Sequence, residues 1–239
     1  MRRGSTGPVG RSDRLGVRSV PVPKPGGGTR WLTVLDPVDQ ATYRAAVRPL
    51  ARRIERSLGP EVLAIRASSR EGPSMLAPWE PARGWWRRSV RRAIGEATRG
   101  TTFAVADVRD CYGSISPETL AELLGPDAAD AVAVLRRFRE RGVRGLPIGP
   151  EPSAVLANAV LSRLDDAIRR SGVSHLRWVD DVVLWGPEAD TRAAMRSLPV
   201  AAAAVGLDLH RHKTRILEDR CEARLVLLGG RDSSIIAAP

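Results

Sequence analysis

Residues 175–184 read HLRWVDDVVL, and they place two adjacent carboxylates, Asp180 and Asp181, in a stretch that otherwise favours buried β-strand. Aspartate is depleted in strands, and burying it as an anion is costly unless a cation or metal compensates the charge. The pair therefore marks either a chain reversal or a metal site. Two-residue hairpins prefer Asn-Gly or Asp-Gly, whereas Asp-Asp only tolerates the positive φ that such a turn needs. From this stretch alone both interpretations remain open.

A third carboxylate, Asp107, lies near the end of an apolar, strand-like segment at 101–108 and is followed by Val108. An aspartate at the end of such a strand can project into a cleft. If this strand lies beside the Asp180 hairpin, Asp107, Asp180 and Asp181 can gather around divalent cations. Carboxylate oxygens suit Mg²⁺, and without cations three neighbouring carboxylates would repel one another strongly.

The composition indicates a protein that binds a polyanion. The chain has 239 residues, 43% of them hydrophobic, which suits one large domain or two closely packed subdomains. A net charge of +11 favours nucleic acid before membrane as the partner. Only Lys24 and Lys213 among the 38 basic residues are lysine, so each is a candidate for a role that needs a compact ammonium.

Other classes of protein are disfavoured. Cys111 and Cys221 are far apart and show no metal-ligand spacing with the three histidines, so neither a disulfide framework nor a zinc site is indicated. No apolar run is long enough for a transmembrane helix, and the N-terminus lacks the apolar region of a signal peptide. We therefore expect a cytoplasmic protein without a membrane partner.

The order of the elements suggests an α+β protein. Residues 1–28 form a basic arm rich in proline and glycine that cannot build a core alone. Helical spacing and capping residues predict helices over 36–58, 85–97, 116 onward, 127–141, 153–170 and 190–205. Strands are expected at 61–65, 101–108, 207–209, 214–217 and 224–228, with loops at 68–83 and 142–149.

Three motifs in order resemble the prokaryotic reverse transcriptases, the group that includes group II intron, retron, diversity-generating and defence-associated enzymes. The first motif is Asp107-Val108 with Tyr112, the second is residues 145–158 (GLPIGPEPSAVLAN), and the third is residues 178–181 (WVDD). The segments 23–40, 206–214 and 227–229 resemble the start of the fingers, the fourth palm motif and the primer grip of that family. The resemblance thus extends from about Pro23 to Gly230.

The resemblance implies a right-hand polymerase fold, in which a palm of antiparallel sheet with packed helices is joined to fingers. It divides the chain into a basic arm (1–28), fingers with part of the palm (29–105), a palm with the catalytic motifs (106–230) and a short tail (231–239). The tail is too short for the usual helical thumb, so we expect the thumb to be missing or minimal. A partner protein, a second subunit or a structured RNA would then hold the duplex.

The implied activity is RNA-directed DNA polymerisation, in which dNTPs are added to a primer 3′-hydroxyl by two Mg²⁺ ions, for which Mn²⁺ can substitute. The partners would be an RNA template, a DNA or RNA primer and dNTPs, in a defence or retroelement system. Asp107, Asp180 and Asp181 would hold the metals together with the carbonyl of Val108. Lys213 would neutralise or protonate the pyrophosphate.

Other family positions would bind the substrates. Lys24 and Arg30 would contact the incoming triphosphate, and Tyr112 would exclude a ribose 2′-hydroxyl. The floor for nucleotide and template would include Ile148, Gly149 and Ser153. Arg66 and the arginines of residues 87–92 would hold template phosphates. A core tyrosine and solvated surface cations are the alternative interpretations of Tyr112 and of the basic residues.

The sequence departs from the family pattern at two positions besides the thumb. Trp178 stands in place of the usual Tyr or Phe, which would keep a flat ring near the primer end. Ile148 stands where many reverse transcriptases have Gln. An apolar residue at this position resembles the error-prone diversity-generating group, although Ala154 does not complete that group's pattern. Two other functions stay open: template-independent or protein-primed DNA synthesis on the same fold, and a non-catalytic RNA-binding scaffold.

Overall fold

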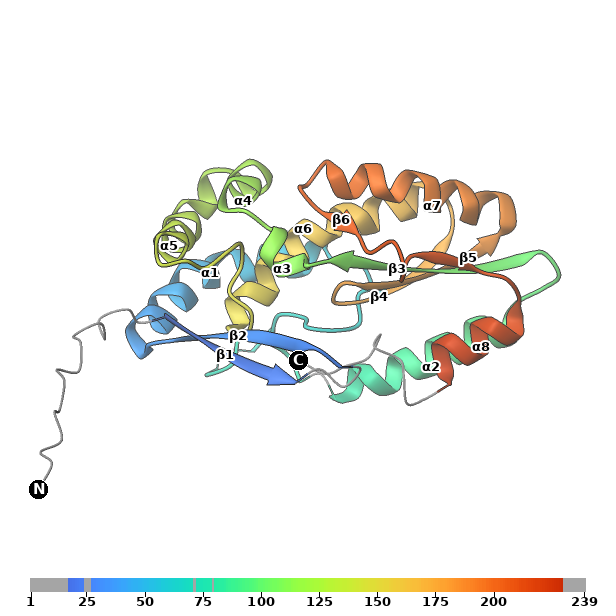
Figure 1. Cartoon of the computed structure of the whole chain (residues 1–239), viewed down its shortest axis with the longest axis horizontal. Coiled ribbons are helices and arrows are strands. Elements are labelled where there is room, and N and C mark those ends of the chain that lie inside the picture. The colour runs from blue at the N-terminus through green and yellow to red at the C-terminus, as the bar shows by residue number, and fades with distance from the viewer. Residues whose placement is uncertain (1–16, 24–26, 71, 79, 230–239) are drawn as a thin grey trace, which may run out of the picture.

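A five-stranded antiparallel sheet lies at the centre of the computed structural model, which describes residues 17–23, 27–70, 72–78 and 80–229 (Figure 1). Its strands are β3 (Thr101–Arg109), β4 (Ser174–Trp178), β5 (Asp181–Pro187), β6 (Asp208–Leu209) and β7 (Arg215–Leu217). The order is β4-β5-β3-β6, and β7 also pairs with β3. The central strand β3 therefore has β5 along one edge and β6 and β7 along the other.

Helices cover both faces of this sheet. On one face lie α6 (Glu151–Arg170) and α7 (Glu188–Ala203), and on the other lie α2 (Glu80–Glu96) and α8 (Arg220–Leu228) (Figure 1). Side chains alternate between the faces along β3, as the pleat of a strand requires. Ala104 and Ala106 belong to the larger core, whereas Phe103 and Val105 belong to a smaller core beneath α2 and α8.

The N-terminal half adds a two-stranded hairpin and a helical group. The hairpin pairs β1 (Val17–Pro23) with β2 (Thr29–Leu35), and α1 (Pro37–Ser57) follows it. The short helix α3 (Cys111–Ser114) follows β3, and it precedes α4 (Pro117–Leu124), the 3₁₀ turn η1 (Gly125–Ala128) and α5 (Ala129–Glu140). A hydrogen bond from Thr33 N to Ile148 O (2.7 Å) joins the hairpin to the loop before α6.

Local capping signals located several helices correctly. Asp36 caps α1 by accepting a hydrogen bond from Asp39 N (2.8 Å), with Pro37 in the first turn. Ser116 caps α4 in the same way, accepting from Thr119 N (3.0 Å). Among the described residues, no helix is both long and apolar enough to cross a bilayer.

Three expectations about local structure were wrong. Residues 17–23, assigned to the basic arm, form β1, whose backbone pairs with β2 in antiparallel register. The segment 61–65 makes only an isolated bridge from Val62 to Arg177. Residues 224–228 are part of α8, whose buried Ala223 and Leu227 lie four residues apart and pack on α2. The segment expected to be the primer grip therefore begins within a helix.

Two expected segments lie outside the described residues. They are residues 1–16 of the arm and the tail 231–239. The predicted division into fingers and palm stays a prediction, whereas the mixture of helices with an antiparallel sheet confirms the α+β class.

Candidate active site

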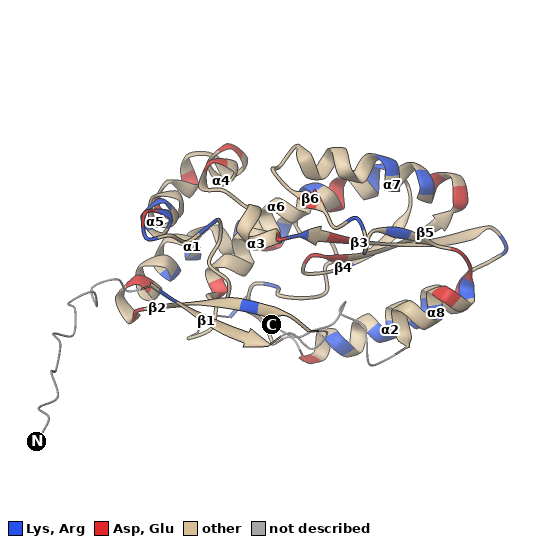
Figure 2. Cartoon of the chain, viewed as in Figure 1, with Lys and Arg blue, Asp and Glu red and all other residues tan. Residues whose placement is uncertain are grey.

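Three carboxylates meet where β3 ends beside the turn between β4 and β5. The antiparallel register sets Asp107 directly opposite Asp181, and both side chains are almost buried (8% and 9% exposed). Asp180 precedes Asp181 in the turn, and its carbonyl accepts a hydrogen bond from Val108 N (3.2 Å). Acidic colour marks the β4–β5 turn and the neighbouring end of β3 in Figure 2. The structure thus brings together the carboxylates that the sequence predicted to converge.

The turn itself is a hairpin tip, shifted by one residue from the expected position. Trp178 pairs with Asp181, so the two turn residues are Val179 and Asp180. Val179 has a φ of 56°, a left-handed conformation that is unusual and strained for a β-branched residue. The shift makes Asp181 the first residue of β5, on the same face of the sheet as Asp107. The chain reversal is therefore confirmed, and the metal-site interpretation of the acidic pair stays a prediction.

Burial and the neighbouring carboxylates shift the pKa values of Asp180 and Asp181 upward. Burial, and then the charge of Asp107, raises the pKa of Asp180 to about 6. Burial and the charges of Asp180 and Asp107 raise the pKa of Asp181 well above its ordinary value. The positive charges of Arg30 and Lys213 lower the pKa of Asp180, so both cations lie close enough to influence its ionisation. Additional positive charge would stabilise the ionised cluster.

Lys213 supplies the cation in closest contact with the cluster. Its Nζ donates a hydrogen bond to Asp107 Oδ2 (2.9 Å). Burial alone would lower the pKa of Lys213, but this hydrogen bond and the carboxylate charges raise that pKa above its ordinary value. The segment that carries Lys213 is held against β3, because His210 N donates to Asp107 O (2.8 Å) and Asp107 N donates to Thr214 Oγ1 (3.3 Å). His210 and Thr214 were not predicted, since no local pattern marks such contacts.

The donor set has the chemistry that a hard divalent cation prefers, namely carboxylate oxygens from three aspartates. Within the described part of the chain, however, no three His, Cys, Asp or Glu residues are already arranged as a metal site. Instead, Lys213 Nζ donates a hydrogen bond to one carboxylate oxygen of Asp107. Val108, expected to offer its carbonyl to a metal, is buried beside the cluster.

Tyr112 lies next to the carboxylates on α3. Its pKa is raised by burial and then by the charges of Cys111 and Asp180, whereas Arg30 lowers it, so Arg30, Tyr112 and Asp180 share one environment. The Tyr112 carbonyl accepts a hydrogen bond from Leu146 N (2.8 Å). Gly145 has a φ of +64°, and a Cβ there would overlap the Tyr112 carbonyl oxygen. The glycine therefore allows the second motif to approach the first.

The remaining substrate candidates are dispersed. Ile148 is half-buried and its carbonyl accepts a hydrogen bond from the β1–β2 hairpin, and Gly149 is exposed with a φ of +119°. Ser153 is fully buried, and its hydroxyl lies 3.1 Å from the Tyr43 hydroxyl. Its side chain is therefore a core contact between α1 and α6 and not an open surface. Lys24 lies outside the described residues.

Trp178 lies directly opposite Asp181 across the β4–β5 hairpin, but its ring is buried against α2. It is 3% exposed, and its ring meets Trp86 of α2 edge to face, with centroids 6.1 Å apart. The expected ring near a primer end is therefore corrected to a core residue that anchors β4 to α2.

Arg66 is likewise a structural residue. Its Nε donates to Glu55 Oε1 (2.6 Å), and its Nη1 donates to the carbonyls of Gly59 (2.8 Å) and Val62 (2.9 Å). These contacts hold the loop after α1 and correct the expectation that Arg66 holds template phosphates. The arginines at 87, 88, 91 and 92 of α2 are exposed, as that expectation requires of them.

Comparison with known proteins agrees with this geometry. The family model described as "Reverse transcriptase (RNA-dependent DNA polymerase)" matches residues 22–224. Similar solved structures include telomerase of Candida tropicalis in complex with the TWJ fragment of telomeric RNA (11% identity, TM-score 0.53, covering 84% of this chain and 40% of that one). Telomerase of Candida albicans with the TWJ fragment (14%, 0.54, 85% and 43%) and an "RdRp complex" (9%, 0.54, 86% and 20%) are also similar.

No curated protein matches the sequence. The chain spans less than half of each of these three chains. At such low identities the likeness shows the fold alone, and that fold is the mixed helix and antiparallel sheet of a polymerase palm, as predicted.

Proposed function

Because this chain belongs to the reverse transcriptase (RNA-dependent DNA polymerase) family, we propose that it adds dNTPs to a primer 3′-hydroxyl under the direction of an RNA template. The observation that carries the proposal is the convergence of Asp107, Asp180 and Asp181 with Lys213 in contact. The setting that we propose, a defence or retroelement system, rests on the resemblance to prokaryotic reverse transcriptases alone.

The carboxylates would hold the cations that this chemistry needs. Two Mg²⁺ ions, for which Mn²⁺ can substitute, would acidify the primer hydroxyl and neutralise the triphosphate. The raised pKa values of Asp180 and Asp181 support this role, because carboxylates that repel one another gain most from added positive charge. The Val108 carbonyl would complete the ligand set.

The neighbouring residues would act on the substrate. Lys213 would neutralise or protonate the pyrophosphate, and Arg30, together with Lys24, would contact the triphosphate. Tyr112 would lie under the sugar and exclude a ribose 2′-hydroxyl. The influence of Arg30 on the pKa values of both Asp180 and Tyr112 supports one shared substrate position.

The floor of the substrate position would come from the second motif. Ile148 and Gly149 would contribute to it directly, since the β1–β2 hairpin reaches the same segment through Thr33. Ser153 would act from behind through its contact with Tyr43. Catalysis by these residues would consist mostly of positioning and electrostatic stabilisation.

The test is primer extension with the purified chain, an oligonucleotide-primed RNA, dNTPs and Mg²⁺. We expect extension by the wild type and none by Asp180→Ala. The matched control is Asp190→Ala, because Asp190 is an exposed aspartate in the first turn of α7, which follows the end of β5 opposite to Asp181. Absence of extension on both RNA and DNA templates would contradict the proposal, and incorporation without any template would favour template-independent synthesis.

A further inference from the structure

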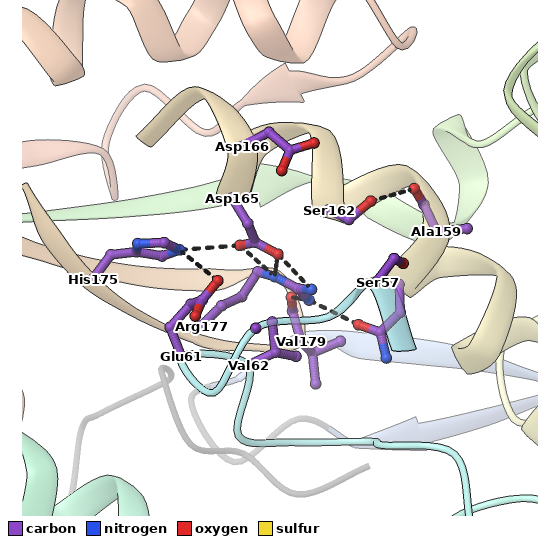
Figure 3. A network of polar contacts seen from close by, with 12 residues as sticks. Ser57, Glu61, Val62, Ala159, Ser162, Asp165, Asp166, His175, Arg177 and Val179 are labelled. Atoms are coloured by element: carbon purple, nitrogen blue, oxygen red, sulfur yellow. Dashed lines mark hydrogen bonds and ion pairs between the residues drawn. The ribbon is translucent and has the colours of Figure 1, made fainter. Parts of the chain in front are cut away.

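A fully buried ion pair, Arg177 with Asp165, lies beside Val179, the residue before Asp180 (Figure 3). Arg177 of β4 is 0% exposed, and its partner Asp165 of α6 is 1% exposed. Arg177 Nε lies 2.9 Å and 3.0 Å from the two carboxylate oxygens of Asp165, and Nη2 donates to Oδ2 at 2.9 Å. One side of the guanidinium fork is therefore fixed on α6.

The other side of the fork reaches the turn. Arg177 Nη1 donates to Val179 O (2.8 Å) and to Asn158 Oδ1 (2.9 Å). Val179 is the turn residue in the left-handed conformation, and Asp180 follows it. The Arg177 side chain thus connects α6 to the peptide group between Val179 and Asp180.

The same network fixes a second unusual backbone. Asn158 Nδ2 donates to Ile65 O (2.8 Å), and Ile65 has a φ of 58°. The main chain of Arg177 also bonds this loop, since Arg177 N donates to Glu61 O (2.9 Å) and Leu63 N donates to Arg177 O (3.0 Å). The loop between α1 and α2 is therefore held by the residue that holds the turn.

Stability alone does not account for this arrangement. Removing two charges from water is costly, and apolar residues of similar volume often replace a buried ion pair without loss of stability. A β-branched residue in the left-handed region persists only where its surroundings enforce the conformation. Burial would raise the pKa of Asp165, but the charge of Arg177 and the contact with His175 lower it, so the pair is ionised.

We propose that Arg177 is a positioning residue, which uses Asp165 as its anchor and holds the Val179–Asp180 turn so that the Asp180 carboxylate faces Asp107. This inference rests on the proposed function, because it assigns to Arg177 the alignment of metal-binding carboxylates. Arginine is required because its planar fork serves an anchor and a backbone carbonyl at once, which a lysine ammonium cannot do.

The first test is Arg177→Lys, which keeps the charge and removes the fork. We expect kcat for primer extension to fall by about 10²-fold, with little change in the KM for dNTP, because small misplacements of catalytic groups have effects of this size. Binding of Mn²⁺, measured by the electron paramagnetic resonance signal of the free ion, should weaken in parallel. The control is Arg192→Lys, the same change at an exposed pair with Glu188 (2.8 Å).

A double variant separates positioning from stability. Asp165→Leu with Arg177→Met removes both charges, so neither is left unpaired in the core. We expect this variant to melt within a few degrees of the wild type and still to lose Mn²⁺ affinity and kcat. Wild-type Mn²⁺ binding and kcat in a folded double variant would overturn the positioning role, whether or not Arg177→Lys folds.

The outcomes distinguish this inference from the proposed function. A wild-type chain that neither binds Mn²⁺ nor extends a primer would overturn both. A wild type that does both, beside an Arg177→Lys variant that matches it, would overturn the role of Arg177 alone.

Discussion

Replacing Asp180 by asparagine should destroy activity and yet stabilise the metal-free protein at neutral pH. The pKa of Asp180 is raised from 3.8 to about 6 by burial and by the charge of Asp107. Its ionised form is therefore less favourable in the folded than in the unfolded chain. This destabilisation is fully present above about pH 6 and disappears as the pH falls toward the unfolded value. An asparagine side chain at this position has no charge to bury, so the variant is free of the destabilisation.

The size of the effect follows from the two pKa values. Their separation corresponds to at most ~3 kcal/mol of unfolding free energy. Asp180 is partly exposed and solvent screens its charge, so we expect a gain of ~1–2 kcal/mol. For a chain of this length the gain corresponds to a rise of ~2–8 °C in Tm.

The assay is thermal unfolding of wild type and Asp180→Asn in EDTA, at neutral pH and at about pH 4.5. The advantage of the variant should shrink in acid, where the wild-type carboxyl is protonated. Added Mg²⁺ should raise the Tm of the wild type more than that of the variant. The exposed Asp190→Asn serves as the control for an ordinary loss of charge. A lower Tm for Asp180→Asn in EDTA at neutral pH, or an advantage unchanged by acid, would refute this reasoning.

Three further predictions follow from the geometry. Lys213→Ala removes the ammonium from the acidic cluster, so primer extension should fall by about 10²-fold and metal-free stability should fall most at neutral pH; single-nucleotide kinetics and melting curves check both. Gly145→Ala should cost ~2 kcal/mol or more in urea denaturation because its Cβ overlaps the Tyr112 carbonyl. Gly142→Ala, with open space around it, should cost only about 1 kcal/mol, and equal costs would contradict the overlap. Arg66→Ala should lower the denaturation midpoint without changing RNA affinity by fluorescence anisotropy; weaker RNA binding by a stable variant would restore its template role.

Local signals were sufficient to predict most of the helices and to single out the carboxylates of the cluster. Capping residues such as Asp36 and Ser116 act within one turn of helix, so their effect is visible in the sequence. Asp107 and the Asp180 pair stood out because burying such charges needs compensation. The α+β class followed from the order of these elements.

Tertiary contacts decided what the sequence did not reveal. A valine disfavours the left-handed conformation that Val179 adopts in the turn. The hydrogen bond from Arg177 to the Val179 carbonyl belongs to a network that includes Asp165 of α6, which is distant in the sequence pattern. Trp178 became a core residue because α2 covers that face of the sheet, which no pattern within β4 indicates. The segment 224–228 is a short apolar run, and such runs do not distinguish strand from helix by periodicity.

The position of β3 in the sheet also determines when the chain can fold. Among the described residues, the strand at 101–109 pairs with segments that begin at Asp181, Asp208 and Arg215, so every partner is made long after it. Closing these long loops costs conformational entropy before the pairing of β3 can stabilise the chain. Until then the apolar side chains on both faces of β3 and its free edges are open to other chains. We therefore expect refolding to be slow and sensitive to protein concentration. The sheet is complete only when β7, which ends at Leu217, has paired with β3.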